Sequence, residues 1–352
     1  MILRKTTKPI HVGNVPVGGG SPISVQSMTK TDTRDAAATI RQIKALAREG
    51  CEIIRVAVPD MEAAKALSKI KKSSPIPVIA DIHFDWRLAQ ESIKQGVDGL
   101  RINPGNIGSE WKLKELVSAL KERPIPVRVG VNAGSLEKEI LKRYGHPGAR
   151  ALVESALKEI ALLEKLGYEE IKVSLKASNV PTTIEAYRLF SKRSGYPLHV
   201  GISEAGPPGT GTVKSAVGLG ILLSEGIGDT IRVSLTANPV EEVKVAYQIL
   251  QSLGIRQSGP EIISCPTCGR TSIGIEALAR KVEKRLGKIK KPVKVAVMGC
   301  VVNGPGEARE ADFGITGAKG KGMIFKKGKV LRTVKEKDLL DELMKEIEAW
   351  KP

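Results

Sequence analysis

The chain has 352 residues and a formal net charge of +18, from 56 Lys and Arg against 38 Asp and Glu. This length allows one large domain plus a small one, and the charge favours a polyanionic partner, either a nucleic acid or a phosphorylated small molecule. Aromatic residues are only 3% of the chain, so stacking platforms are scarce, and no nucleic-acid-binding motif is present. We therefore expect a small phosphorylated ligand and no nucleic acid.

The N-terminal sequence has no apolar run long enough for a signal peptide, and no stretch approaches the roughly 18 uncharged apolar residues of a membrane span. The four cysteines suggest no disulfide framework, which is typical of a reducing compartment. These features predict a cytoplasmic protein with no membrane partner.

A hairpin is predicted at residues 10–17, and short apolar strands then alternate with amphipathic helices. Strands are expected at residues 23–28, 52–58, 77–82, 99–103, 126–131, 170–175, 197–202 and 230–235, and helical segments at 35–49, 61–72, 86–95, 110–122, 135–166, 182–193, 212–225 and 240–253. Alternating strands and helices imply parallel pairing, and eight such units over about 250 residues are typical of a TIM (β/α)8 barrel. A doubly wound open sheet is the alternative. The barrel would span residues 1–253.

A short linker, residues 254–259, precedes a different pattern. Strands are expected at 261–264, 293–298, 313–316, 323–325 and 330–333, and helices at 274–286 and 337–350. We interpret residues 260–352 as a small α/β domain.

Several of the barrel strands place a basic residue between apolar ones, namely Arg55, Arg101, Arg128, Lys172 and Arg232. A buried guanidinium is costly unless it is paired. One interpretation is pairing with the acids Glu52, Asp98, Glu170 and Asp229, which precede four of these residues. The other, which we favour for the arginines, is a ring of cations that binds phosphate at the barrel mouth. For Lys172 the two are evenly balanced.

Polar residues also collect where the predicted strands meet their following loops. They include Asp81, His83, Asn106, Asn132, Ser174, Lys176, His199, Glu204 and Ser234. The carboxyl ends of barrel strands form the catalytic face of this fold, so the clustering predicts an active site. Glu204 is the favoured acid, since a carboxyl group among cations and apolar walls can have its pKa tuned by those surroundings.

Three of the four cysteines lie near the C-terminal end of the chain: Cys265 and Cys268 in a CxxC turn, and Cys300 after another predicted strand. A structural zinc site needs four closed ligands, and no second CxxC follows. Iron–sulfur clusters also take four ligands, mostly thiolates. Glu307, on the glycine-rich loop after Cys300, is the candidate oxygen ligand. The pattern favours an iron–sulfur cluster, with zinc or unrelated structural thiols as alternatives.

Seven motifs occur in the order of a known family: ADIHFD (80–85), LRINPGN (100–106), VRVGVN (127–132), HVGISEAG (199–206), IRVSLT (231–236), CPTCGR (265–270) and MGCVVNGPGE (298–307). Across nearly its whole length the chain resembles the 4-hydroxy-3-methylbut-2-en-1-yl diphosphate synthases, iron–sulfur enzymes of the methylerythritol phosphate route to isoprenoids. The short linker matches the two-domain form of the family, which lacks a large extra domain.

The resemblance implies a [4Fe-4S] cluster held by Cys265, Cys268, Cys300 and Glu307. It also implies reductive ring opening of 2-C-methyl-D-erythritol 2,4-cyclodiphosphate, with two electrons from a flavodoxin or a ferredoxin. By motif position, Arg55, Arg101, Arg128, Lys176 and Ser234 would hold the diphosphate, and Asn132 and Glu204 would lie by the reacting carbons. We add Arg232, His83 and Asn106 as further substrate-binding candidates.

Two other functions remain open on the residues alone. A pterin-type barrel transferase would use the same phosphate pocket but has no need of the cysteines. A zinc-containing nucleic-acid-binding protein would use the cysteines and the charge but leaves the residues at the barrel mouth unexplained.

Chain geometry also predicts a homodimer. The helix at 240–253 descends about 20 Å away from the catalytic face, and the linker reaches only about 20 Å when fully extended. We expect each small domain to cap the barrel of a second copy, in a two-fold dimer that shares its active sites between chains.

Overall fold

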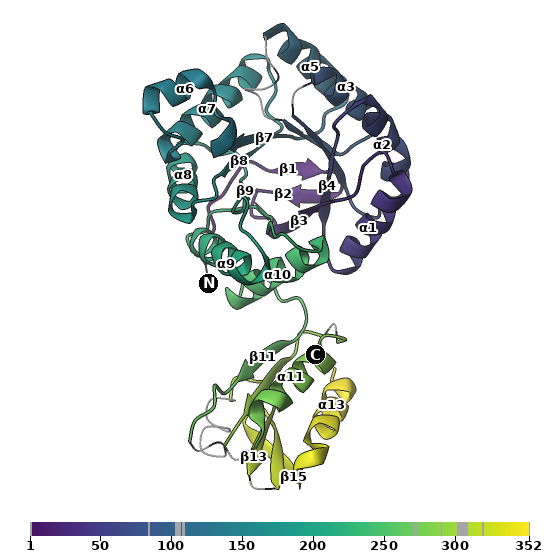
Figure 1. Ribbon diagram of the computed structural model, residues 1–352, viewed down its shortest axis with the longest axis vertical. Coiled ribbons are helices and arrows are strands. Elements are labelled where there is room, and N and C mark those ends of the chain that lie inside the picture. The colour runs from purple at the N-terminus through teal and green to yellow at the C-terminus, as the bar shows by residue number, and fades with distance from the viewer. Residues whose placement is uncertain are drawn as a thin grey trace. The chain divides into compact units, whose positions relative to one another are not determined.

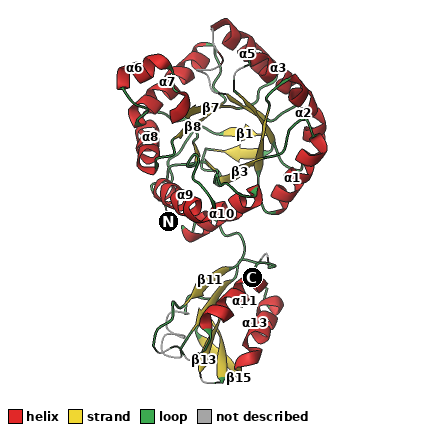
Figure 2. Ribbon diagram, viewed as in Figure 1, coloured by secondary structure: helices red, strands yellow, loops and turns green. Residues whose placement is uncertain are grey.

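The computed structural model describes residues 2–83, 85–102, 107, 110–269, 271, 273–289, 291–300, 309–318 and 320–351 (Figure 1). The chain folds into two compact units, Met1–Ile255 and Arg256–Pro352. The first unit is a ring of helices around a central sheet, and the second is a smaller sheet with helices (Figure 2).

The barrel sheet contains the parallel strands β3 (Ser24–Met28), β4 (Ile53–Ala57), β5 (Val78–Ile82), β6 (Gly99–Ile102), β7 (Val127–Asn132), β8 (Ile171–Lys176), β9 (His199–Val200) and β10 (Thr230–Ile231). Their order is β8-β7-β6-β5-β4-β3-β10-β9. The amide of Val173 donates to the carbonyl of Pro197 at 2.9 Å, which joins β8 to the segment before β9 and nearly closes the ring. The predicted TIM barrel is confirmed.

The outer helices are α1 (Ala36–Arg48), α2 (Met61–Ser73), α3 (Trp86–Lys94), α5 (Glu110–Glu122), α6 (Lys138–Tyr144), α7 (Ala149–Lys165), α8 (Val180–Arg193), α9 (Pro208–Ser224) and α10 (Pro239–Ser252). Several begin at a side-chain cap: Asp35, Asp60 and Asn179 each accept a hydrogen bond from the amide three residues on. Such caps satisfy amides that the first helical turn leaves without a partner. The apolar faces of the helices, such as Ile43 and Leu46 of α1, are buried against the strands.

The predicted hairpin is present as β1 (Ile10–Val12) and β2 (Val15–Val17), paired from Ile10 to Val17. Its apolar side packs on Ile53 and Ile79, which lie at the amino ends of β4 and β5. The hairpin therefore covers the amino end of the barrel and leaves the carboxyl ends of the strands for a site.

Two strand predictions are too long: β9 and β10 have two residues each, whereas 197–202 and 230–235 were expected. After Arg232, whose amide still donates to Val200 at 3.0 Å, the two segments leave the ladder, and they meet again only at the Gly206–Leu235 bridge. Glu204 adopts a left-handed backbone with φ of 51°, which is incompatible with an extended strand. Glu204 and Ser234 therefore lie beyond the last ladder residues of these two strands.

The second unit has one mixed sheet of β11 (Glu261–Ser264), β12 (Lys294–Met298), β13 (Phe313–Ala318), β14 (Lys321–Lys326) and β15 (Lys329–Lys335), in that order. The first three strands are parallel, and the last two run antiparallel to their neighbours. Helices α11 (Ile275–Leu286) and α13 (Leu339–Ala349) supply apolar side chains to the core of this unit. The carboxyl ends of β11 and β12 lie side by side, and a cysteine follows each.

Candidate active site

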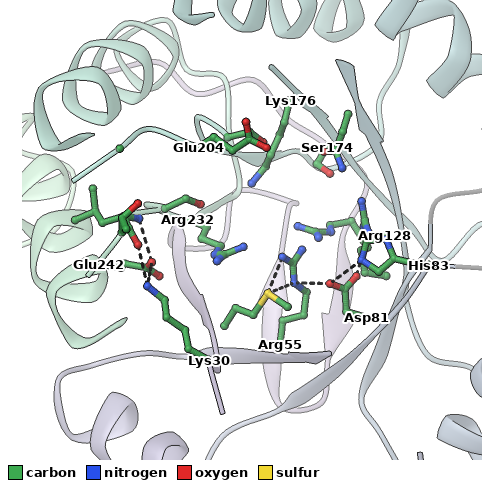
Figure 3. Close-up of a pocket in the computed structure, with 18 residues that line it drawn as sticks. Lys30, Arg55, Asp81, His83, Arg128, Ser174, Lys176, Glu204, Arg232 and Glu242 are labelled. Atoms are coloured by element: carbon green, nitrogen blue, oxygen red, sulfur yellow. Dashed lines mark hydrogen bonds and ion pairs between the residues drawn. The ribbon is translucent and has the colours of Figure 1, made fainter. Parts of the chain in front are cut away.

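A cavity of about 390 Å³ opens at the carboxyl ends of the barrel strands (Figure 3). Its lining includes eleven of the residues proposed from the sequence: Arg55, Asp81, His83, Arg101, Arg128, Asn132, Ser174, Lys176, Glu204, Arg232 and Ser234. Asn106, the other substrate-binding candidate, and Glu307, the candidate cluster ligand, lie outside the described residues. The barrel thus gathers at one mouth side chains that are far apart in the sequence.

Strand register explains this convergence. Asp81 of β5 pairs with Arg101 of β6, Arg101 with Arg128 of β7, and Arg128 with Lys172 of β8. Directly paired residues project to the same side of a sheet, here the barrel interior. One register therefore carries a carboxylate and three bases around the inside of the barrel.

Asp81 is the anionic centre of this ring. Its carboxylate lies 3.5 Å from Nε of Arg55, 3.2 Å from Nη1 of Arg101 and 3.6 Å from Nε2 of His83. Burial would raise the pKa of Asp81, but the charges of Arg55 and Arg101 and the hydrogen bond from His83 lower it far below its usual range. Asp81 is therefore ionised at any physiological pH.

The acids expected to pair with the strand bases have other roles. Glu52 accepts a hydrogen bond from the amide of Val25, Asp98 is paired with Lys71 on α2, and Asp229 with Arg4. The proposed pairing with the preceding acids is therefore wrong in these three cases. The carboxylate that does pair with strand arginines is Asp81, from the end of β5.

Positive charge remains in excess. The lining contains three acids, Asp81, Glu204 and Glu242. Against these stand six lysines and arginines: Lys30, Arg55, Arg101, Arg128, Lys176 and Arg232. Burial lowers the pKa of Arg128 well below its usual value, and the charges of Arg55 and Arg101 lower it further. Burial likewise lowers the pKa of Lys176, with Arg128 and Arg232 adding to the effect. Because arginine stays protonated in proteins, these shifts mean that the site holds charge that an anion would stabilise.

Two of these lining residues, Lys30 and Glu242, were not expected. Nζ of Lys30 lies 3.0 Å from Oε1 of Glu242, a residue of α10 that is 2% exposed. Glu242 also accepts hydrogen bonds from Ser27 and from the amide of Leu235. Lys30 follows β3 by two residues, so its strand-end position could have revealed it, but nothing in the sequence shows that a helical glutamate turns inward.

Two further polar residues lie inside the barrel without lining the cavity. Lys172 is 1% exposed and His199 is fully buried, and neither Nζ of Lys172 nor either ring nitrogen of His199 has a hydrogen-bond partner among the described residues. Burial lowers the pKa of Lys172 to about 7, and the charge of Arg128 contributes. Burial also lowers the pKa of His199 well below its usual range, with Lys176 and Arg128 adding to it, so the imidazole is neutral.

Comparison with known proteins identifies the relatives of this chain. A family model described as the GcpE TIM-barrel domain matches residues 7–247, and one described as the GcpE protein C-terminal domain matches residues 261–349. The chain belongs to the GcpE family. It is 61% identical over 346 residues to a protein of Geobacter sulfurreducens, covering 98% of each chain, and 61% identical over 347 residues to one of Thermodesulfovibrio yellowstonii, covering 99% of each. Both carry the name 4-hydroxy-3-methylbut-2-en-1-yl diphosphate synthase (flavodoxin).

The likeness of this GcpE chain to one solved structure of low identity concerns the fold alone. A truncated 3-deoxy-D-arabino-heptulosonate 7-phosphate synthase of Thermotoga maritima has a TM-score of 0.51 at 14% identity, over 71% of this chain and 95% of its own.

The family match confirms the predicted enzyme class and supports neither the pterin-type transferase nor the zinc-containing nucleic-acid-binding protein. Family membership also makes this an iron–sulfur enzyme. Among the described residues, no helix is both long enough and apolar enough to cross a membrane.

The cysteines of the GcpE C-terminal domain follow neighbouring strands. Cys265 comes directly after β11 and is half-buried, Cys268 is exposed, and Cys300 is buried two residues after β12. Ser264 pairs with Val297, so β11 and β12 end at the same level, and the turns that carry Cys265 and Cys300 begin next to each other. In the described part of the chain no three Cys, His, Asp or Glu side chains are gathered as a metal site, and residues 301–308 lie outside that part. The donor chemistry, soft thiols from adjacent strand ends, fits an iron–sulfur cluster.

The first prediction concerns the stability cost of Lys172 in this GcpE barrel. Between its lowered pKa of about 7 and the usual 10.5, the unfolded chain binds a proton that the folded chain does not, so stability rises with pH across that window. We expect Lys172→Met to raise the free energy of unfolding at pH 7 by about 2–4 kcal/mol and to flatten its rise with pH. Denaturant unfolding at pH 7, 8 and 9 would measure both effects. Equal slopes in the two proteins would show that Lys172 is charged and paired in the fold.

Proposed function

We propose that the chain catalyses the reductive ring opening and dehydroxylation of 2-C-methyl-D-erythritol 2,4-cyclodiphosphate to 4-hydroxy-3-methylbut-2-en-1-yl diphosphate. The names of its relatives support this substrate and product. The observation that carries the proposal is the pocket itself, which holds six basic residues against three acidic ones at the carboxyl ends of the strands. A cyclic diphosphate supplies the negative charge that this pocket lacks.

The proposed binding of the diphosphate falls mainly to Arg55, Arg101, Arg128, Lys176 and Arg232, with Ser234 and His83 as further donors and Asn106 as a candidate from its motif. Arg55 now donates to the sulfur of Met28, at 3.2 and 2.9 Å, and Arg128 has no ion pair among the described residues. Phosphate oxygens would be better acceptors than a thioether for these planar donors. Asp81 then acts as a positioning residue that orients Arg55 and Arg101 toward the anion.

Asn132 and Glu204 are the proposed residues at the reacting carbons. Asn132 ends β7, and Glu204 is exposed at the mouth on its left-handed backbone. A left-handed backbone at a residue other than glycine is a strained conformation that is often kept for function. In the reaction a carbon–oxygen bond to the diphosphate breaks, and a hydroxyl leaves with a proton as water while two electrons are consumed. Glu204 is the proposed source of that proton.

The proposed cofactor is a [4Fe-4S] cluster held by Cys265, Cys268, Cys300 and Glu307. When bound, it supplies single electrons and a Lewis-acidic iron for the departing oxygen. A carboxylate ligand exchanges more readily than a thiolate, which is why Glu307 suits a position that must open to substrate. A flavodoxin, as the names of the relatives indicate, or a ferredoxin is the proposed electron donor. The proposed location is cytoplasmic, because cysteines that serve as cluster ligands need a reducing compartment.

A direct test is anaerobic purification followed by turnover with the cyclic diphosphate and a reduced flavodoxin. We expect a brown protein with about four iron and four sulfide per chain and formation of the linear diphosphate. Cys300→Ala should lose the cluster, whereas Glu307→Ala should keep iron on three thiolates and turn over slowly. A colourless protein with one zinc would overturn the proposal, and full activity of Glu307→Ala would remove Glu307 from the ligand set.

Arg128 offers a test of anion binding that is separate from folding. We expect Arg128→Gln to raise KM by about ten- to a hundredfold, the loss of one charged hydrogen bond of about 1.5–3 kcal/mol, without lowering the melting temperature. The matched control is Arg101→Gln, which also breaks the 3.2 Å ion pair with Asp81 and should lower both affinity and stability. A lower melting temperature with unchanged KM for Arg128→Gln would instead indicate that Arg128 supports the fold and not the ligand.

The proposed homodimer places the cysteines of one chain over the barrel of its partner. Helix α10 runs from the carboxyl ends of the strands toward their amino ends, and only eight residues separate Ser252 from β11. A linker this short makes it difficult for the cysteines of a chain to reach the mouth of that chain's own barrel.

Subunit exchange between two inactive variants tests this dimer. Cys300→Ser lacks the cluster and Glu204→Gln lacks the proposed acid, so a mixed dimer should regain one intact site and part of the activity. Native mass spectrometry of the mixture would verify that exchange has occurred. If mixed dimers form and stay inactive, each site is built within a single chain.

A further inference from the structure

Lys172 has no role in the site described above, although it is one of the most deeply buried titratable groups of the barrel. It is the second residue of β8, is 1% exposed, and its Nζ has no hydrogen-bond partner among the described residues. A buried amine without a partner is costly, and the costly groups of a fold are often functional.

The position of Lys172 relative to the pocket follows from strand geometry. Side chains at alternate positions of a strand face the same side, so residues 172, 174 and 176 all point into the barrel. Ser174 and Lys176 line the cavity, and Lys172 does not. Lys172 therefore lies one step of about 7 Å below Ser174, under the floor of the pocket. Its neighbour across the ladder is Arg128, which reaches the cavity.

The groups that face Lys172 from the surrounding strands are mostly cationic or neutral. Arg128 on β7 and Arg55 on β4 repel its charged form, and His199 on β9 is neutral and buried. The acid that attracts it is Asp229, before β10, but that carboxylate already accepts hydrogen bonds from Arg4, Thr7 and the amide of Leu198. Lys172 thus lies close to positively charged arginines, and the one acid that attracts it, Asp229, is already paired with Arg4.

We propose that Lys172 is a positioning residue for the substrate anion: it takes up a proton when a diphosphate binds to Arg128, its neighbour across the ladder. The inference rests on the proposed function, because it requires a diphosphate in this cavity. A dianion on Arg128 and Lys176 reverses the local field, and the protonated amine then adds its attraction from below. Burial and the charge of Arg128 lower the pKa of the free Lys172 to about 7, so that an added anion shifts its charge at physiological pH.

The chemistry of the substrate makes this proton countable. A cyclic diphosphate diester has only strongly acidic protons and is fully ionised near neutral pH. Protons taken up on binding therefore go to the protein. His199 carries a neutral imidazole against the same cations, so its protonation is less favourable than that of the lysine.

The test is calorimetric titration of the cluster-loaded protein with the cyclic diphosphate, anaerobic and without reductant, at pH 8 in two buffers of different ionisation enthalpy. We expect the wild-type chain to take up about one proton more per site than Lys172→Met. Between pH 7.5 and 8.5 the wild-type Kd should rise by about tenfold more than that of the variant. The matched control is Lys71→Met, whose lysine pairs with Asp98 outside the cavity, and which should behave as the wild type does.

Each outcome decides between the two proposals. Equal proton uptake and equal pH dependence in the wild type and Lys172→Met would overturn the role of Lys172 while leaving the function intact. If the role of Lys172 is purely structural, Lys172→Met changes the stability of the protein, but the variant and the wild type take up the same number of protons on binding. If neither protein binds the cyclic diphosphate at any pH, the proposed function fails and this inference fails with it.

Discussion

The first unit depends on basic side chains held inside a barrel. Four arginines and two lysines, at positions 55, 101, 128, 232, 172 and 176, lie within its interior or line its mouth. Among the described residues, only Asp81 pairs directly with more than one of them, and Arg128, Arg232 and Lys172 keep donor atoms unused. A fold normally avoids such a concentration, because uncompensated buried charge costs stability. The cost is consistent with a site whose ligand completes the charge balance.

The rest of the barrel can be understood as support for this site. The hairpin covers the amino end, so the polar interior opens at the carboxyl ends of the strands. Strands β9 and β10 end early, and Glu204 and Ser234, which follow them, line the opening. Lys30 and Glu242 pair across the junction between β3 and α10 and bring a helix into the wall of the pocket. The regular strands thus place most of the basic residues, and the less regular segments place Glu204 and Ser234 in the pocket lining.

The second unit uses the same principle at smaller scale. Its cysteines follow the carboxyl ends of two adjacent parallel strands, as the polar residues of the barrel do. One apolar core lies under the helices, and a smaller cluster that includes Phe325, Met298 and Cys265 forms separately. The strands therefore anchor the turns that carry the thiols of Cys265 and Cys300.

The sequence by itself determined the order and type of nearly every element, because alternating apolar strands, amphipathic helices and their caps are local signals. It also determined which residues to examine, since strand ends in this fold meet at one mouth and seven motifs mark one family. Tertiary structure alone decided which charges are paired. Asp81, rather than the acids nearest in sequence, pairs with Arg55 and Arg101, and Glu242 enters the wall from a helix. Tertiary structure alone also distinguished two lysines of β8: Lys176 lines the cavity, whereas Lys172 is buried and does not line it. Pairing and burial depend on distances across the barrel between residues far apart in the chain, and no local pattern of residues records those distances.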